Sequence, residues 1–99
     1  MIKINYLSER AHEVMSKRFK ANKHTSIKAW LIFISMLWRH ADDAIHKPEC
    51  NRFIYSELEL VLADIIVLCV AILHQLGVKN IENLIRKRIE DNDKANNTK

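Results

Sequence analysis

The chain has 99 residues, 48% of them hydrophobic and 28% charged, with one glycine, one proline and a net charge of +4. This length supports one domain, and so few turn-forming residues exclude a strand-rich fold. The apolar runs are shorter than the roughly 18–20 residues that span a bilayer, and the N-terminus lacks the apolar core of a signal peptide. We therefore expect a soluble cytoplasmic protein with no membrane partner. The two ends are basic and the middle is acidic, but no RRM, KH or zinc-finger pattern supports nucleic acid as a partner.

Helical spacing predicts a first, amphipathic helix over residues 5–20. A second helix is predicted over 26–46, because Thr25 or Ser26 can cap its start and Pro48 must follow its end. Its first half is the dense apolar block AWLIFISMLW, and its second half turns polar. The first half should therefore lie in the core, while the second half meets water.

A third helix is predicted over residues 56–76. Ser56 and Glu59 form a capping box at its start, and Gly77 supplies the left-handed residue that often ends a helix. Residues 65–73 carry no polar side chain, so we expect this helix to be buried on every side.

A fourth helix is predicted from Ile81 to about Asp91, with Asn80 as its cap. Residues 1–92 then form a single all-α domain, and the polar residues 93–99 form a disordered tail. The second and third helices should make an antiparallel hairpin flanked by the two thinner helices. Because those flanks cannot cover so apolar a hairpin, we expect it to pair with the hairpin of a second copy in a homodimeric helical bundle, with a tetramer also open.

The order of these features resembles the MazG-like all-α nucleoside triphosphate pyrophosphohydrolases. The matching segments are Ala63-Asp64-Ile65-Ile66, Leu76-Gly77 and Arg88-Ile89-Glu90-Asp91-Asn92, within a shared layout over residues 7–94. The resemblance implies a helical hairpin in which four carboxylates, arranged as ExxE and ExxD, hold Mg²⁺ for cleavage between the α and β phosphates. Two such pairs on antiparallel helices would converge on one cation.

Carried over position by position, this resemblance retains one of the four carboxylates. The ExxE positions hold Leu37 and His40, and the ExxD positions hold Val61 and Asp64. A single carboxylate with an imidazole supplies too few oxygens for Mg²⁺. The usual metal site is therefore expected to be absent, which leaves His40 and Asp64 as the candidate catalytic residues.

A shifted metal site is one alternative. His40 and Asp43 are spaced as i and i+3, and Glu57 lies one turn before Val61, so His40, Asp43, Glu57 and Asp64 could share a pocket. These acids could equally be solvated charges near helix ends. For Asp64, the structural alternative is a pair with Arg39 or Lys17, or a hydrogen bond to a tryptophan.

Further candidate ligand-binding residues lie in the fourth helix and in the second helix. Arg86, Lys87, Arg88, Asn92 and Lys94 could contact phosphates, and the resemblance points to Arg88 and Asn92. Trp30 and Trp38 could stack on a base, although packing is the commoner role of such residues. Both cysteines, Cys50 and Cys69, are interpreted as reduced and structural, and the remaining four histidines receive no role.

Three functions remain open from the sequence. The first is a MazG-like protein with a degenerate Mg²⁺ site that binds a nucleotide or small ligand at a dimer interface, with little or no catalysis and no cofactor. The second is an active NTP pyrophosphohydrolase that uses the shifted site with Mg²⁺. The third is a non-catalytic interaction or scaffold dimer.

Overall fold

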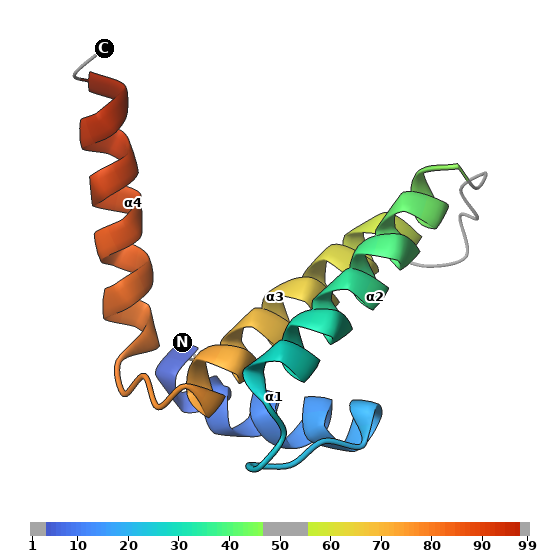
Figure 1. Ribbon diagram of the computed structural model, residues 1–99. Helices are drawn as coiled ribbons and strands as arrows, with labels where there is room; N and C mark the ends of the chain where they lie inside the picture. Colours follow the sequence, from blue (N-terminus) through green and yellow to red (C-terminus); the bar gives the residue numbers. More distant parts are fainter. Residues whose placement is uncertain (1–3, 47–55, 98–99) are drawn as a thin grey trace.

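The computed structural model describes residues 4–46 and 56–97. These ranges form four helices and contain no strand: α1 (Ile4–Phe19), α2 (Ile27–Ile45), α3 (Glu57–Gln75) and α4 (Ile81–Asn97) (Figure 1). The predicted all-α class and the number of helices are thereby confirmed. In this part of the chain, no helix is long and apolar enough to cross a membrane.

The helix starts are fixed by the side chains that the sequence indicated. The Ala29 N–H donates to Ser26 Oγ at 3.2 Å, and the Glu59 N–H donates to Ser56 Oγ at 3.2 Å. The Ser56 hydroxyl in turn donates to Glu59 Oε1 at 3.1 Å. Each cap satisfies a backbone N–H that has no partner within its helix.

The end of α3 and the start of α4 agree with the sequence, whereas the end of α4 does not. Gly77 has a φ of 83°, the left-handed conformation predicted for the residue after α3. The Asn83 N–H donates to Asn80 Oδ1, as expected for the α4 cap. However, α4 continues to Asn97, beyond the predicted end near Asp91, because residues 92–97 contain no proline or glycine to stop it. Residues 98–99 lie outside the described ranges.

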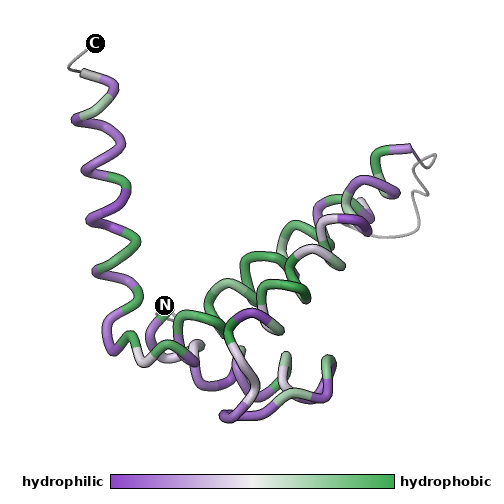
Figure 2. Tube along the Cα trace, in the orientation of Figure 1, coloured by the Kyte–Doolittle hydropathy of each residue, from purple (hydrophilic) through white to green (hydrophobic). Residues whose placement is uncertain are grey.

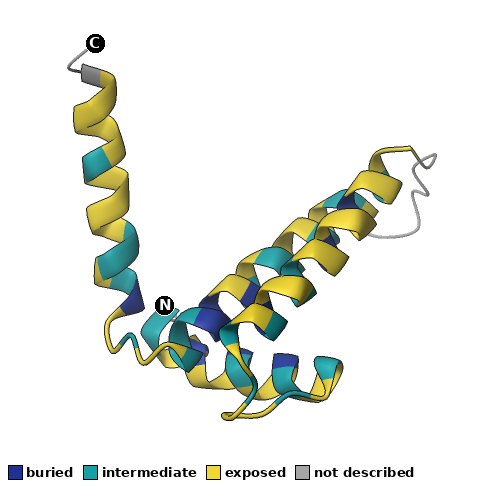
Figure 3. Cartoon of the chain, viewed as in Figure 1, coloured by how far each residue is buried: buried dark blue, intermediate teal, exposed yellow. Residues whose placement is uncertain are grey.

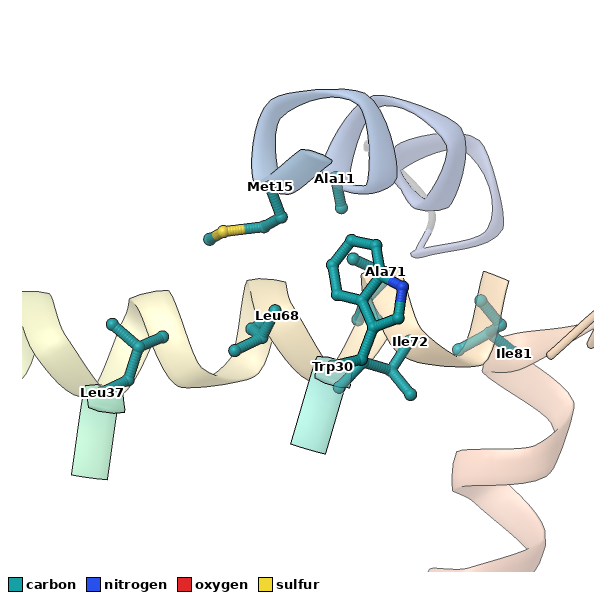
Figure 4. Packing of buried hydrophobic residues seen from close by; sticks show 9 residues of the cluster. Ala11, Met15, Trp30, Leu37, Leu68, Ala71, Ile72 and Ile81 are labelled. Carbon is teal, nitrogen blue, oxygen red and sulfur yellow. The ribbon is translucent and has the colours of Figure 1, made fainter. Parts of the chain in front are cut away.

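Helices α2 and α3 form an antiparallel hairpin, and α1 crosses beneath the end where α2 begins and α3 ends (Figure 1). Buried residues concentrate where α1 meets the hairpin (Figure 3). Trp30 reaches from α2 across α3 toward Ala11 of α1, beside Ala71 and Ile72 (Figure 4). The fully buried side chains of this core are Trp30, Leu37, Leu68 and Ile81.

Helix α4 is attached at its base and leads away from the hairpin (Figure 1). The side chain of Asn5 in α1 makes two hydrogen bonds to the start of α4. Its Nδ2 donates to Asn80 Oδ1 at 2.9 Å, and its Oδ1 accepts from the Glu82 N–H at 2.9 Å. Ile81 is buried against this junction. Beyond it α4 is mostly hydrophilic, whereas the apolar residues concentrate in the hairpin (Figure 2).

The expectation that α3 is buried on every side is wrong for the single chain. Leu62, Ile66 and Cys69 are exposed, although Leu68, Ala71 and Ile72 are buried. Helix α1 covers one side of α3 and α2 covers a second, which leaves a third side uncovered. The flanking helices therefore leave part of the hairpin open to solvent, as the sequence suggested.

Candidate functional site

Asp64 forms an ion pair with Arg18, and it is not enclosed by apolar side chains. Arg18 Nη1 lies 3.1 Å from Asp64 Oδ2, and the two side chains are 39% and 42% exposed. The sequence suggested Arg39 or Lys17 as the partner. Lys17 instead pairs with Glu13 on its own helix, whereas Arg18, at the end of α1, is carried by the crossing of α1 to the side of α3 where Asp64 lies.

The residues at the other three positions of the ExxE and ExxD pattern, Leu37, His40 and Val61, supply no oxygen ligand beside Asp64. Leu37 is fully buried in the core, Val61 is half-buried, and His40 is exposed. Leu37 belongs to the same buried cluster as Leu68. Only Asp64 among these four positions presents a carboxylate.

The structure does not gather the residues of the shifted metal site. His40, Asp43 and Glu57 are all exposed near the end of the hairpin that connects to residues 47–55. Within the described ranges, no three His, Cys, Asp or Glu side chains converge in a way that could hold a metal ion. Residues 47–55, including Cys50, lie outside those ranges.

The candidate phosphate ligands are separated from Asp64. Arg88, Asn92 and Lys94 are exposed on the outer part of α4, which leads away from the hairpin (Figure 1). Arg88 Nη1 lies 3.5 Å from Asp91 Oδ2, and Arg86 Nη2 lies 3.0 Å from Glu82 Oε1. Both arginines therefore form ion pairs with carboxylates of their own helix. These residues and Asp64 do not form one pocket.

A polar cluster that the sequence did not reveal lies between α1 and the end of α3. Gln75 Nε2 donates to the carbonyls of Lys23 at 2.9 Å and Thr25 at 3.1 Å, which turns Gln75 Oε1 toward His12 Nε2 at 2.6 Å. Because this oxygen can only accept, His12 Nε2 must carry the proton. Gln75 thereby clamps the link between α1 and α2 to the end of α3.

His74 completes this cluster. Its ring centroid lies 5.1 Å from that of His12, and its Nδ1 lies 3.4 Å from Ser8 Oγ. The Ser8 hydroxyl already donates to the Asn5 carbonyl at 2.9 Å, so His74 Nδ1 must be the donor to Ser8. Two adjacent polar residues at the end of an apolar helix were the only signal for this cluster in the sequence.

An open groove of about 940 Å³ lies beside the cluster. It is bounded by the first turns of α1 and by the α3–α4 link, and His74 lies on its wall. Its charged side chains are of both signs, since Glu9 and Glu13 face it together with Arg10 and Lys79. Arg10 is paired with Glu13 at 3.1 Å, so the groove does not favour one class of ion.

Trp38 and Cys69, which the sequence assigned to the core, are exposed in the structure. Trp30 is fully buried, but Trp38 is 67% exposed. Cys69 is exposed, although partial burial of its sulfur raises the pKa of the thiol. An exposed tryptophan and an exposed cysteine on the same hairpin indicate an uncovered surface.

The described carboxylates therefore offer no converging oxygen ligands, and Asp64 is paired with the guanidinium of Arg18. Comparisons with protein-family models, with curated proteins and with solved structures found no match.

Proposed function

We propose that the chain is a non-catalytic assembly protein with a MazG-like helical layout. The ion pair between Arg18 and Asp64 carries this proposal. A hard divalent cation needs several oxygen ligands, and Arg18 neutralises the one carboxylate present while Leu37 and Val61 offer no oxygen. Asp64 then contributes to holding α1 against α3 and has no role in hydrolysis.

The test is pyrophosphate release from the common NTPs and dNTPs in the presence of Mg²⁺ or Mn²⁺. We expect no release by the unmodified protein. We also expect none by Arg18→Ala, which frees the Asp64 carboxylate but adds no ligand. Robust release that is abolished by Asp64→Ala would overturn the proposal in favour of an active pyrophosphohydrolase.

Binding of a nucleotide or small ligand between two copies, without hydrolysis, is a second candidate function. The exposure of Trp38 favours it, because an exposed indole offers an aromatic face on which a base can stack. Under this function, nucleotides without metal should raise the melting temperature, and Trp38→Ala should abolish the rise. An unchanged melting temperature at millimolar nucleotide would exclude this second function, and assembly would remain as the proposed function.

A further inference from the structure

Both helices of the hairpin carry a second apolar stripe besides the one in the core. Apolar residues spaced alternately by three and four positions form such a stripe along one side of a helix. On α2 the exposed members of the stripe are Leu31, Trp38 and Ile45; Ile27 and Ile34, partly buried against the core, and the buried Ala41 form its inner edge. On α3 the exposed members are Leu62, Ile66, Cys69 and Leu76, and Leu73 is partly buried against the core.

Six large side chains of these stripes are open to solvent. Their exposed fractions lie between 43% and 67%, and they are Leu31, Trp38, Ile45, Leu62, Ile66 and Leu76. A core helix does not usually leave its aromatic and branched residues this exposed. The stripes therefore serve a contact that the single chain does not make.

The two stripes face the same way, on the side of the hairpin opposite α1. Phe33 marks the α1 side of α2, because its ring stacks on Phe19 at 4.5 Å. At about 100° per residue, Trp38 lies about 140° round α2 from Phe33. Likewise, Ile66 lies about 160° round α3 from Asp64, which pairs with α1. We call this combined surface the hairpin face.

The hairpin face has the size of an interface between proteins. Each helix has 19 residues, so the face is about 28 Å long and about 18 Å wide. Its exposed apolar side chains amount to roughly 600 Å², more than the few hundred Å² that most monomers expose in one patch. A standard interface buries about 800 Å² per partner, which the face and its polar rim can supply.

We infer that a second copy of this chain covers the hairpin face, with its hairpin antiparallel, so that the two hairpins form a four-helix bundle. This inference rests on the assembly role proposed above and adds the partner and its orientation. Two helical hairpins with self-complementary apolar stripes can close symmetrically on each other.

The charges beside the stripes distinguish the two possible orientations. Asp42 lies at the connecting end of α2, with His46 Nε2 4.0 Å from its Oδ1. Lys28 lies at the opposite end and has no ion pair within the described residues. In the antiparallel arrangement, α2 faces α2 and Asp42 of one copy lies near Lys28 of the other. In the parallel arrangement, α2 faces α3 and Asp42 lies near Glu59 of the other copy. Charge complementarity therefore favours the antiparallel arrangement.

The first part of the test is the oligomeric state, measured by light scattering at about 10 μM, a concentration at which an interface of this size should be occupied. We expect a mass twice the 11.6 kDa of one chain. Ile66→Glu should give a helical monomer, because this exposed side chain supports the bundle and not the core of the chain. Ile89→Glu is the matched control, since Ile89 is equally exposed on α4 and outside the hairpin face; it should leave the dimer intact.

The second part of the test is charge reversal at the rim, measured by sedimentation at low salt. Asp42→Lys should weaken the dimer about 2- to 25-fold, since symmetry places two exposed pairs in each dimer. Adding Lys28→Asp to the same chain should restore the affinity. Tighter association of Asp42→Lys would instead show the parallel arrangement and overturn the orientation.

The outcomes separate this inference from the proposed function. A monomer that releases no pyrophosphate would overturn the inference and leave the non-catalytic function standing. A dimer that hydrolyses NTPs would overturn that function and leave the hairpin face as the site of self-association. A dimer that survives Ile66→Glu unchanged would overturn the assignment of the hairpin face.

Discussion

Replacing Gln75 with leucine should destabilise the fold more than any other change of a polar side chain at its surface. Gln75 is the only described residue that connects α3, α1 and the α1–α2 link by side-chain hydrogen bonds, through the carbonyls of Lys23 and Thr25 and through His12. Leucine keeps most of the bulk of glutamine but can neither donate nor accept. The substitution therefore isolates the contribution of the hydrogen bonds.

The magnitude follows from what each partner loses. The carbonyls of Lys23 and Thr25 lie in a link near the surface, so water replaces part of each lost bond, at a net cost of about 0.5–1.5 kcal/mol per bond. His12 is only partly exposed, and its Nε2 proton loses an acceptor at 2.6 Å; an unsatisfied donor of this kind costs about 1–3 kcal/mol. We expect a total loss of about 2–6 kcal/mol in the free energy of unfolding, or roughly 10–30 °C in the melting temperature of a domain of this size.

Urea unfolding followed by circular dichroism measures this loss. Both proteins must be compared at one concentration, because self-association adds to the apparent stability. Asn92→Leu is the control, since Asn92 is an exposed amide of α4 whose side chain has no partner within the described residues. A loss below about 0.5 kcal/mol for Gln75→Leu, within the range of ordinary surface substitutions, would refute the clamp.

Two further predictions concern single features of α3. Gly77→Ala should cost about 1–2 kcal/mol in unfolding free energy because of the positive φ at this position. Steric contacts add nothing to this cost, since an added Cβ would have no atom within 4 Å. A neutral effect in urea unfolding would contradict the positive φ. Because partial burial raises the pKa of Cys69 above 9.0, its thiolate fraction at pH 7.5 is below that of an ordinary cysteine. The test uses Cys50→Ser combined with Ile66→Glu, so that no second copy covers Cys69. Its alkylation should be slower in the folded than in the urea-unfolded chain, and the rate should still be rising at pH 9; equal rates at pH 7.5 would contradict the shift.

The helix ends were predictable because each depends on side chains within a few residues. Ser26, Ser56 and Asn80 each accept from the N–H three positions later, and Gly77 adopts its positive φ within the same turn. Such contacts form wherever a helix begins or ends, and tertiary packing does not need to supply them. The bounds of the first three helices consequently match the sequence to within one residue.

The partners of the polar side chains were not predictable in this way. His12 and Gln75 are separated by 63 positions, and Arg18 and Asp64 by 46. Which of the neighbouring cations meets Asp64 depends on the angle at which α1 crosses the hairpin. Periodicity places Lys17 and Arg18 about 100° apart on α1, and only the tertiary arrangement decides between them.

The two tryptophans show the limit of reading a helix as apolar or polar. Trp30 and Trp38 both lie in the apolar half of α2, yet Trp30 is fully buried and Trp38 is 67% exposed. At about 100° per residue they are about 80° apart, which is enough to put them on different sides of the helix. Assigning each residue to one of two stripes would have separated them.

The same distinction explains the composition of α3. A helix that meets α2 on one side, α1 on a second and, as we propose, another copy on a third needs apolar residues almost all round, although no single contact encloses it. Asp64 then lies on the α1 side at the point where α1 ends, so that its carboxylate reaches Arg18 and solvent together. A charge at the edge of a helix contact needs no metal ion to account for it. The position of Asp64 is thus explained by where α1 stops covering α3, and the apolar run beyond Asp64 by the surfaces that the run packs against.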